Sequence, residues 1–323
     1  MATIGIDVGG TKCLGVVLES GQVVARYRIP TPGGGPGLVA ALSAMVEILI
    51  QRAWADGVHG IEAVGVGLPG LVDRHGFLEV APNLSGSRGV NLPDQLSTLV
   101  NLPVVVDNDA TCATWAEFRA GAAQTAASAL VITLGTGIGA GIVAGGRLVR
   151  GAHGFAGEIG HMVVDPDGQQ CPCGRQGCWE RFASGSAMAR TARIKADAGG
   201  AQAIVAIAGN IESIRGEHVG VAAAAGDPDA IDLVESLAGW VALGLANLVS
   251  ILDPDLIVIG GGMGAMGELL LAPTRRELNR IIQIVDGRSE AVTLVAAQLG
   301  EMAGAMGAAL LAQERAGADG RIH

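Results

Sequence analysis

The sequence predicts an α/β protein built from two duplicated halves with a cleft between them. Half of the 323 residues are apolar, which is enough for two medium-sized domains with buried cores. Glycine is frequent, at 51 residues, and aromatic residues make up only 3%, which suits tight turns at strand ends. A pattern of strand, glycine turn and hairpin also appears twice, with an offset of 125 residues.

The first half opens with three expected strands at residues 4–6, 13–18 and 23–29, the last two joined by a hairpin turn at Gly21-Gln22. Helical spacing of apolar residues follows at 38–55. Two further strands are expected at 63–68 and 104–106, each followed by a polar or glycine-containing turn. A helix at 110–122 comes next, and Asp109 is the expected N-cap residue.

The second half repeats the opening. Gly10, Thr11 and Gly21 fall on Gly135, Thr136 and Gly146. Strands are expected at 129–134, 256–259 and 292–296, with mostly helices after the cysteine-rich stretch and a small-residue-rich helix at 301–311. We therefore expect a smaller N-terminal domain at 1–122 and a larger C-terminal domain at 123–311, with a last helix at about 312–323 returning to the first domain.

The charge and the cysteines limit the classes of function. A net charge of −10 without any basic run argues against a nucleic-acid-binding surface. The chain begins in a strand-like run without the features of a signal peptide, and no apolar segment free of glycine and charge reaches the ~20 residues that span a bilayer. We expect a cytoplasmic protein that neither binds nor spans a membrane, in a compartment where thiols stay reduced.

Four residues have the spacing of a metal site: His161, Cys171, Cys173 and Cys178. Four such ligands complete a tetrahedral zinc site and leave no position for a reacting water, so the zinc is expected to be structural. The alternative is chance packing of small buried residues, which the clustering of three cysteines in eight residues disfavours. The remaining two, Cys13 and Cys112, are expected to be core residues or free thiols.

Glycine-rich turns at strand ends indicate a phosphate-binding site. Asp7 ends a strand and is followed by Gly9, Gly10, Thr11 and Lys12, whose backbone and side chains can donate to phosphate, while Asp7 can hold Mg²⁺ directly or through water. Two more such turns come later, at 135–137 and 260–262. One glycine turn is weak evidence, but three at strand ends predict a bound nucleotide. The pattern of a P-loop is absent.

Several polar residues suit a polyhydroxylated ligand. Asp109 stands where a strand meets a helix and could accept a proton from a substrate hydroxyl, although an N-cap role is the simpler interpretation. The residues expected to bind such a ligand are Asn83, Asn108, Asp109, Glu158, His161 and Glu180. For the two glutamates, the alternative is an ordinary solvated charge.

The motifs DVGGTK, DNDA, LGTGIGAG, GEIGH and CPCGRQGCWE, in this order, resemble the ROK family of bacterial sugar kinases and sugar-responsive repressors. The resemblance covers nearly the whole chain. It implies the actin/hexokinase-like (ribonuclease H-like) duplicated fold. DxGGT alone indicates only the wider superfamily, whereas the His and Cys pattern is specific.

The resemblance also implies a role for each matching residue. Asp109 becomes the catalytic base. The sugar ligands become Gly70, Asn83, Asn108, Asp109, Glu158, His161 and Glu180. The nucleotide and phosphate contacts become Asp7, Gly9, Gly10, Thr11, Lys12, Gly135, Thr136, Gly137, Gly260, Gly261 and Gly262. The zinc ligands are the four residues named above.

Two departures from the family pattern lie near these motifs. Asp107 and Thr111 flank Asn108-Asp109-Ala110 where the family commonly has Glu and Asn, and Ser87 or Arg88 replaces a common Trp. The second departure bears on which sugar is bound. Family repressors carry an N-terminal helix-turn-helix domain, and here the first strand starts at residue 2, which disfavours DNA binding.

The expected function is that of an ATP-dependent hexose kinase with glucose as the preferred sugar, using Mg²⁺ with the nucleotide and a structural Zn²⁺. The alternatives are N-acetylmannosamine, N-acetylglucosamine, fructose or mannose as acceptor, polyphosphate as donor, and a non-catalytic sugar-binding regulator. The expected ligands are a sugar and a nucleotide. A homodimer or homotetramer is also expected, because the family commonly forms both.

Overall fold

The structure, a computed structural model, describes all residues except 82–83, 85, 87–88, 287–291 and 320–323. The chain divides into two compact units, which are described separately. The first comprises Met1–Thr125, Gly141–Gly157 and Gln298–His323, and the second Ala126–Ala140 and Glu158–Ala297. The domain boundaries expected from the sequence stay a prediction.

The first unit contains a five-stranded sheet in the order β3-β2-β1-β4-β7. Strands β1, β2 and β3 pair antiparallel, whereas β1, β4 and β7 run parallel. A two-stranded sheet, β5-β6, is joined to it in sequence. The strands are β1 (Ala2–Val8), β2 (Lys12–Glu19), β3 (Gln22–Pro30), β4 (Ile61–Leu68), β5 (Leu71–Val72), β6 (Leu78–Val80) and β7 (Val104–Asn108).

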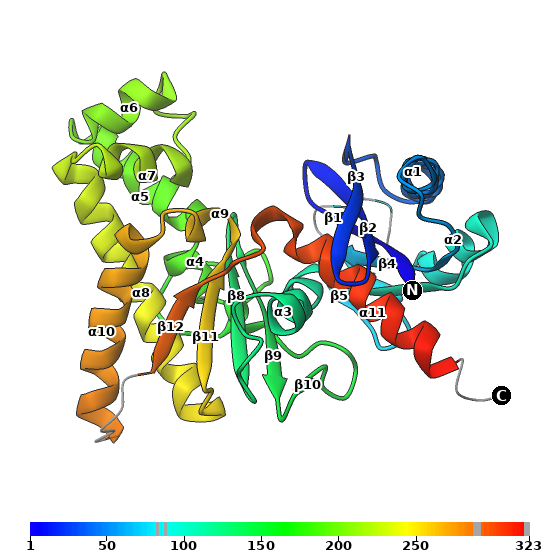
Figure 1. Cartoon of the computed structure of the whole chain (residues 1–323). Helices are drawn as coiled ribbons and strands as arrows, with labels where there is room; N and C mark the ends of the chain where they lie inside the picture. The colour runs from blue at the N-terminus through cyan, green and yellow to red at the C-terminus, as the bar shows by residue number, and fades with distance from the viewer. Residues whose placement is uncertain (82–83, 85, 87–88, 287–291, 320–323) are drawn as a thin grey trace. The chain divides into compact units, whose positions relative to one another are not determined.

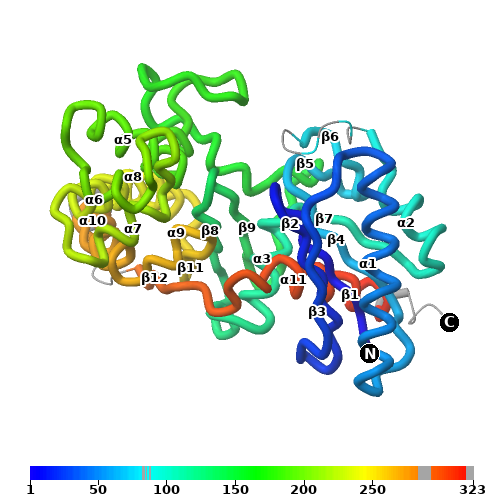
Figure 2. Tube along the Cα trace, turned by 90° about the horizontal axis from the view of Figure 1, so that it is seen from above, coloured from blue at the N-terminus to red at the C-terminus, as the bar shows by residue number. Residues whose placement is uncertain are grey.

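Helices cover both faces of this sheet. One buried cluster joins α1 and α2 to residues such as Ile4 and Val64, and a second joins α3 and α11 to Leu14 and Val16 (Figures 1 and 2). A Cβ on Gly5 would lie 1.9 Å from Ala305 O, so the sheet and α11 approach closely. The helices are α1 (Pro36–Ala55), α2 (Leu92–Val100), α3 (Asp109–Ala120), η2 (Gly300–Met302) and α11 (Ala303–Asp319).

The second five-stranded sheet has the order β10-β9-β8-β11-β12, which repeats the topology of the first. Again a hairpin, β9-β10, lies at one side, and β8, β11 and β12 run parallel. This repetition confirms the predicted duplication. The strands are β8 (Ala129–Leu134), β9 (Ile138–Ala144), β10 (Arg147–Leu148), β11 (Leu256–Gly260) and β12 (Thr293–Ala296).

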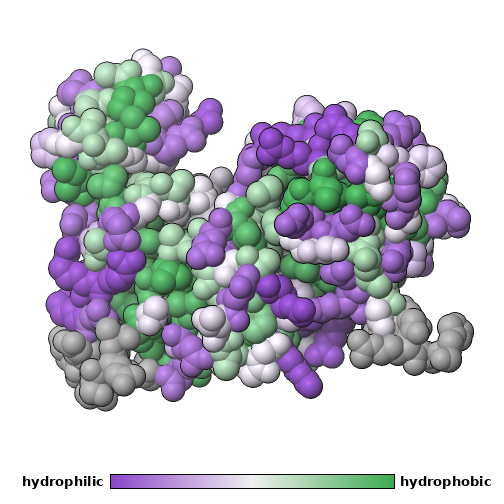
Figure 3. Space-filling view, in the orientation of Figure 1, coloured by the Kyte–Doolittle hydropathy of each residue, from purple (hydrophilic) through white to green (hydrophobic). Residues whose placement is uncertain are grey.

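Helices make up most of the remainder of the second unit. The long α8 and α10 pack side by side, and α5, α6 and α7 form a group at one end of α8 (Figure 1). Figure 3 shows hydrophobic surface on this group, where Ile194, Ile207 and Val221 are exposed. The helices are η1 (Ile159–His161), α4 (Glu180–Ala183), α5 (Gly185–Asp197), α6 (Gln202–Ala208), α7 (Gly216–Ala224), α8 (Pro228–Leu252), α9 (Gly261–Gly264) and α10 (Glu268–Asp286).

Two helices, α1 and α8, are long and apolar enough to cross a membrane when judged by length and composition alone. About half of each apolar window is buried inside the protein, 44% in α1 and 56% in α8. The core helices of soluble proteins meet the same criteria, so this is weak evidence for a membrane span. Both helices contain glycine and charged residues, so neither is the uninterrupted apolar segment that the expectation concerned.

Two predicted details of local structure are wrong. The β2-β3 turn is formed by Ser20 and Gly21, with φ of 50° and 81°, and not by Gly21-Gln22. Both φ values are positive, as in a type I′ turn, so the glycine is the second residue of the turn. The small-residue-rich segment also forms one helix, α11, instead of ending at residue 311 and starting again.

Candidate functional site

In the first unit, Asp7, Gly70, Asn108 and Asp109 come together at the carboxyl edge of the parallel strands β1, β4 and β7. This edge is the usual ligand-binding side of such sheets. The pKa of Asp7 is raised to about 7, mainly by burial and then by the negative charge of Asp109, while the positive charge of Lys12 lowers it. The two carboxylates therefore interact electrostatically within one site.

Asn108 is the N-cap residue of α3, so the expected N-cap role of Asp109 is wrong. The Asn108 Oδ1 accepts a hydrogen bond from Thr111 N at 3.0 Å, and its Nδ2 donates to Gly70 O at 3.0 Å. Asp109 is the first residue of the helix, and its Oδ1 accepts from Ala110 N at 2.8 Å. An amide group has two N–H donors, so the second Nδ2 hydrogen of Asn108 can still serve a ligand.

Gly70 adopts a conformation that other residues rarely reach. Its φ is 117°, and a Cβ there would lie 2.0 Å from Val80 O. The Asn108 amide thus holds a turn that only glycine fits.

The expected phosphate-binding turn after β1 is fixed by backbone and side-chain hydrogen bonds. Gly9 N donates to Lys12 O at 2.9 Å, and Thr31 N donates to Thr11 O at 3.0 Å. The Thr31 hydroxyl donates to Gly9 O at 2.6 Å. Gly10 is exposed, and a Cβ there would meet no atom within 4 Å. The turn therefore leaves open space at its tip, where a phosphate could approach.

Glu301 contacts this turn, although no motif in the sequence marks it. Its carboxylate lies 2.8 Å from Lys12 Nζ and 2.5 Å from Arg28 Nη2. The pKa of Glu301 is lowered, first by the hydrogen bond and the positive charge of Lys12. The positive charge and the hydrogen bond of Arg28 lower it further. Lys12 is therefore held by a partner before any phosphate binds. The only sequence signal was a small-residue-rich helix able to pack closely.

The same helix explains the burial of Asp7. A Cβ on Gly304 would lie 2.7 Å from Asp7 Oδ1, so only glycine fits where α11 passes the carboxylate. The short stretch from η2 into α11 thus contains both Glu301 and Gly304, the glycine that lies against Asp7.

A second residue that sequence analysis missed is Glu117, whose side chain is fully buried. Its carboxylate accepts hydrogen bonds from Gln298 N at 3.0 Å, from Leu299 N at 2.8 Å and from Ala122 N at 2.8 Å. Residues 122 and 298 lie close to the positions where the chain leaves and re-enters the first unit. One buried carboxylate therefore binds the chain near its first departure from this unit and at its final return to it.

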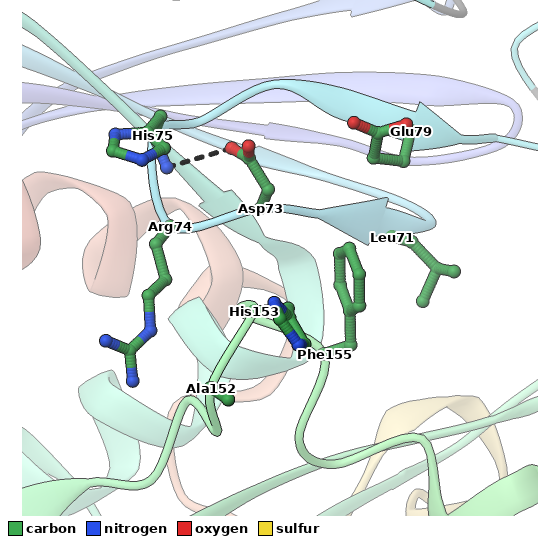
Figure 4. A pocket seen from close by; sticks show the side chains of 8 residues that line it. All are labelled: Leu71, Asp73, Arg74, His75, Glu79, Ala152, His153 and Phe155. Carbon is green, nitrogen blue, oxygen red and sulfur yellow. Dashed lines mark hydrogen bonds between the residues drawn. The ribbon is translucent and has the colours of Figure 1, made fainter.

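The first unit also contains a pocket of about 390 Å³. Leu71, Asp73 and Glu79 line it from the β5-β6 hairpin, and His153 and Phe155 from the segment after β10 (Figure 4). Asp73 Oδ1 accepts from His75 N at 2.8 Å, as the dashed line in Figure 4 shows. None of the residues predicted to bind sugar or nucleotide lines this pocket.

In the second unit, the four predicted metal ligands come together. The donor atoms of His161, Cys171, Cys173 and Cys178 all lie within 4.8 Å of one another. Cys171 Sγ is 3.7 Å from His161 Nδ1, and Cys173 Sγ is 3.5 Å from Cys178 Sγ. Bonds of about 2.0–2.3 Å to a tetrahedral zinc require donor separations of roughly 3.3–3.8 Å, so this donor set fits zinc.

The cysteine loop has the tight turns that its glycines predict. Gly174 and Gly177 have φ of 91° and 72°. A Cβ on Gly177 would lie 1.5 Å from Asp165 O, so only glycine fits there. Cys171 N donates to Arg175 O at 2.8 Å, which closes the turn between the first and last cysteines.

Three of the residues expected to bind sugar, Glu158, His161 and Glu180, belong to the second unit with this cluster. His161 directs Nδ1 toward the sulfurs, and its Nε2 lies 4.0 Å from Glu158 Oε2. Burial raises the pKa of Glu158, His161 opposes the change, and Glu180 adds to it. The structure therefore brings Glu158, His161 and Glu180 into one electrostatic group beside the cysteines.

The glycine turns at 135–137 and 260–262 lie side by side. A Cβ on Gly261 would lie 2.4 Å from Leu134 O, and Gly135 O accepts a hydrogen bond from Gly185 N at 2.8 Å. Glu180 Oε2 accepts from Ile138 N at 2.9 Å, directly after the first turn. The carboxylate expected to bind sugar is thus also bound to the expected nucleotide turn.

Three residues discussed from the sequence cannot be placed. Asn83, an expected sugar ligand, and Ser87 and Arg88, at the departure from the family pattern, lie outside the described residues. Their roles stay predictions.

The sequence pattern of the ROK family matches residues 3–315. Glucokinase from Streptomyces coelicolor is 42% identical over 318 residues, 97% of this chain and 98% of the relative. N-acetylmannosamine kinase from Citrobacter koseri is 34% identical over 97% of this chain and 99% of the relative.

A solved structure extends the similarity to the fold. The crystal structure of a ROK family glucokinase from Streptomyces griseus in complex with glucose and AMPPNP superposes with a TM-score of 0.86 at 42% identity. It covers 97% of this chain and 100% of that one. Together with the repeated strand order, this confirms the predicted actin/hexokinase-like fold. The chain belongs to the ROK family.

Proposed function

We propose that this chain is an ATP-dependent glucokinase, which transfers the γ-phosphoryl group of ATP to the C6 hydroxyl of D-glucose. The proposal rests on one observation: Asp109 and Asp7 lie near each other at the carboxyl edge of one sheet. The chain also belongs to a family that includes sugar kinases. Asp7 belongs to the expected phosphate turn and Asp109 is the expected base. Their proximity suits a reaction between a hydroxyl and a phosphoryl group.

Asp109 acts as the general base in this proposal. Its Oδ1 accepts a hydrogen bond from Ala110 N, which orients the carboxylate, and we assign this carboxylate to accept the proton of the C6 hydroxyl as that oxygen attacks phosphorus. Gly70 and Asn108, which are hydrogen-bonded to each other, would hold the sugar beside the base. Most of the rate acceleration should come from positioning and charge neutralisation, as is usual in phosphoryl transfer.

The nucleotide would be bound by the glycine turns. The turn at 9–12 offers backbone N–H groups, the Thr11 hydroxyl and Lys12, and the turns at 135–137 and 260–262 offer more backbone donors. Asp7 is the expected partner of Mg²⁺, directly or through a water. When bound, the ion supplies positive charge to the phosphates. Before a phosphate binds, Lys12 is oriented by Glu301.

The sugar would also contact the polar group beside the cysteines. His161 Nδ1 faces the sulfurs, so we propose that Nδ1 binds zinc and Nε2 is left for the sugar and Glu158. Zinc would be structural here, because four protein ligands fill its coordination sphere. Glu158 and Glu180 would then accept hydrogen bonds from sugar hydroxyls. Asn83 is proposed as a further sugar ligand.

An N-acetylmannosamine kinase is the second candidate, because relatives with that activity are 34–35% identical over a similar length. Kinases of N-acetylglucosamine, fructose or mannose, a polyphosphate donor and a silent regulator are less favoured alternatives. We also propose a cytoplasmic enzyme that binds sugar and nucleotide, does not bind nucleic acid, and assembles as a homodimer or homotetramer.

The proposal is tested by identifying the product. The purified protein is incubated with ATP, Mg²⁺ and glucose, and the products are separated and examined by ³¹P NMR. We expect ADP and glucose phosphorylated at C6. ATP hydrolysis without sugar phosphate, or no consumption of ATP with any hexose, would contradict the proposal.

A further inference from the structure

Three arginines gather in the second unit outside the residue groups assigned above. Arg181 lies on α4, and Arg190 and Arg193 lie three residues apart on α5. Burial, followed by the positive charges of Arg181 and Arg193, lowers the pKa of Arg190. The guanidinium group of Arg190 is therefore repelled by those of both Arg181 and Arg193. Such a cluster is unexpected in a chain with ten more acidic than basic residues.

No carboxylate among the described residues lies within the 4.0 Å of an ion pair from these three guanidinium groups. Other arginines of the same unit are paired. Arg275, Arg276 and Arg280, on α10, each bind a glutamate. The lack of acidic partners in the α4-α5 cluster therefore does not hold for the whole unit.

The hydrogen bonds of the cluster are also incomplete. Arg190 donates to Arg181 O, and Arg193 Nη2 donates to Ile214 O at 2.7 Å. Arg181 Nη2 reaches Gln169 Oε1 only at 3.5 Å. The Nε atoms of Arg181 and Arg193 are buried and have no acceptor among the described atoms. Buried donors without an acceptor are costly, which points to a missing acceptor.

A pocket of about 100 Å³ opens beside this cluster. Its polar lining comes from Gln169, Arg181, Arg190, Thr191 and Ser236, and no acidic residue takes part. At ~30 Å³ for each water, the pocket holds roughly three waters, or one tetrahedral oxyanion, and it is too small for a nucleotide. The apolar remainder of the lining comprises Phe182, Met188, Leu233, Leu237 and Trp240.

We propose that this pocket, the oxyanion pocket, binds a phosphate group through the guanidinium groups of Arg181 and Arg190. Arg193 adds positive charge, and the hydroxyl of Ser236 can donate a further hydrogen bond. Guanidinium groups bind phosphate oxygens in pairs, and the apolar walls strengthen the attraction by excluding water. The phosphate is either a free ion or the end of a phosphorylated small molecule. The site does not depend on the proposed kinase activity.

The first test is a calorimetric titration with inorganic phosphate. Glucose, Mg²⁺ and a non-hydrolysable ATP analogue are kept at saturation, so that the expected nucleotide site is filled. We expect saturable binding at one site, weakened at least about tenfold in Arg190→Gln by loss of a charge-assisted contact. Arg280→Gln, which removes an equal charge from an exposed pair, should leave phosphate binding unchanged.

Arg190→Gln also removes a hydrogen bond to the chain, so a second variant guards against misfolding. Ser236 is exposed on the pocket rim, and Ser236→Asp places a carboxylate beside the arginines without removing any contact of theirs. We expect it to abolish phosphate binding while leaving the melting temperature equal or higher. Ser236→Asn is the matched neutral control and should retain binding.

The source of the phosphate is tested by repeating the titration with a hexose 6-phosphate and with sulfate. Tighter binding of the hexose 6-phosphate indicates a phosphorylated metabolite, and tighter binding of the inorganic ion indicates free phosphate. The proposal is overturned if wild type shows no saturation, or if Arg190→Gln and Ser236→Asp bind phosphate as wild type does. The second result would mean an adventitious ion only.

Discussion

The carboxylate of Glu180 accepts a hydrogen bond from the backbone N–H of Ile138 at 2.9 Å. Glu180 stands two residues after the metal-ligand candidate Cys178, and Ile138 directly follows the glycine turn at 135–137. Gly137 has no room for a side chain, because a Cβ there would lie 2.2 Å from Glu180 Oε2. The cysteine loop and the expected nucleotide turn are therefore joined through a single side chain.

This hydrogen bond predicts that Glu180→Ala and Glu180→Gln will change the KM for ATP to different extents. Glu180→Ala removes the acceptor for Ile138 N, so we expect the KM for ATP to rise about tenfold, together with a higher KM for glucose. Glu180→Gln keeps a neutral acceptor, so the KM for ATP should change less than about threefold while that for glucose rises. Steady-state kinetics with each substrate varied measures both values. An unchanged KM for ATP in Glu180→Ala would contradict this role, and Glu212→Ala, an exposed change in the same unit, is the control.

The role of Asp109 predicts that Asp109→Asn lowers kcat by about 10²–10⁴-fold, because an amide cannot accept the hydroxyl proton. The affinity for glucose should change little, since asparagine keeps the shape and the acceptor for Ala110 N. Kinetics and calorimetric glucose binding test the two parts. Turnover equal to that of wild type would show that another group is the base.

The metal assignment predicts that Cys173→Ser removes zinc and weakens glucose binding. The variant loses one of four ligands, so the loop that carries His161 and leads into Glu180 should no longer be held. Elemental analysis gives the zinc content, and calorimetry gives the affinity for glucose. Cys112→Ala, a buried cysteine of the other unit, should keep the metal. Loss of zinc with unchanged glucose affinity would show that the metal does not shape the sugar site.

The raised pKa of Asp7 predicts a dependence of stability on pH. Its pKa rises from 3.8 to about 7 on folding, so between these values the folded state binds more protons than the unfolded state. The free energy of unfolding should therefore fall as pH rises from about 4 to 7, and level off above that, by at most about 4 kcal/mol. Asp7→Asn should reduce this fall.

This prediction is measured by urea unfolding at pH 5 and pH 8, without nucleotide or Mg²⁺. The difference between wild type and Asp7→Asn isolates the carboxylate, because other titrating groups contribute to both proteins. Asp73→Asn, which changes another aspartate of the same unit, provides the comparison. An equal pH dependence in wild type and Asp7→Asn would contradict the assigned burial of Asp7.

The hydrogen bonds of Glu117 predict that a conservative substitution there will lower the stability of the fold. Glu117→Gln keeps the size but leaves one acceptor oxygen where two serve Ala122, Gln298 and Leu299. We expect the free energy of unfolding to fall by about 2–3 kcal/mol, the usual contribution of hydrogen bonds to a charged group. Chemical unfolding measures it, with the exposed Glu62→Gln as the control. A change below about 0.5 kcal/mol would show that these hydrogen bonds add little to stability.

The strands, the duplication and the metal ligands could be predicted because each depends on local spacing. The repeated glycine turns marked the two hairpins, and three cysteines within eight residues marked the donor cluster. The choice between Asn108 and Asp109 as N-cap could not be made. Both residue types are good caps, and only the structure shows that Asn108 accepts the hydrogen bond from Thr111 N while its amide also donates to Gly70 O, 38 positions away.

The functional residues that the sequence did not mark make contacts with residues far away in the chain. Glu117 and Leu299 are 182 positions apart, and Lys12 and Glu301 are 289 apart. A lone glutamate in a sequence is most simply interpreted as a solvated charge, and only the fold shows which backbone N–H groups surround it. The oxyanion pocket likewise depends on three helices meeting, and no local spacing marks it.

The central claim is that this chain phosphorylates glucose with ATP, and it is tested most directly by comparing kcat/KM for five sugars. The panel is glucose, mannose, fructose, N-acetylglucosamine and N-acetylmannosamine, each with ATP and Mg²⁺ in a coupled assay. The account predicts that glucose has the highest kcat/KM by at least about tenfold, a difference of ~1.4 kcal/mol in transition-state binding. Preference for an N-acetylated sugar, or no turnover with glucose, would contradict it.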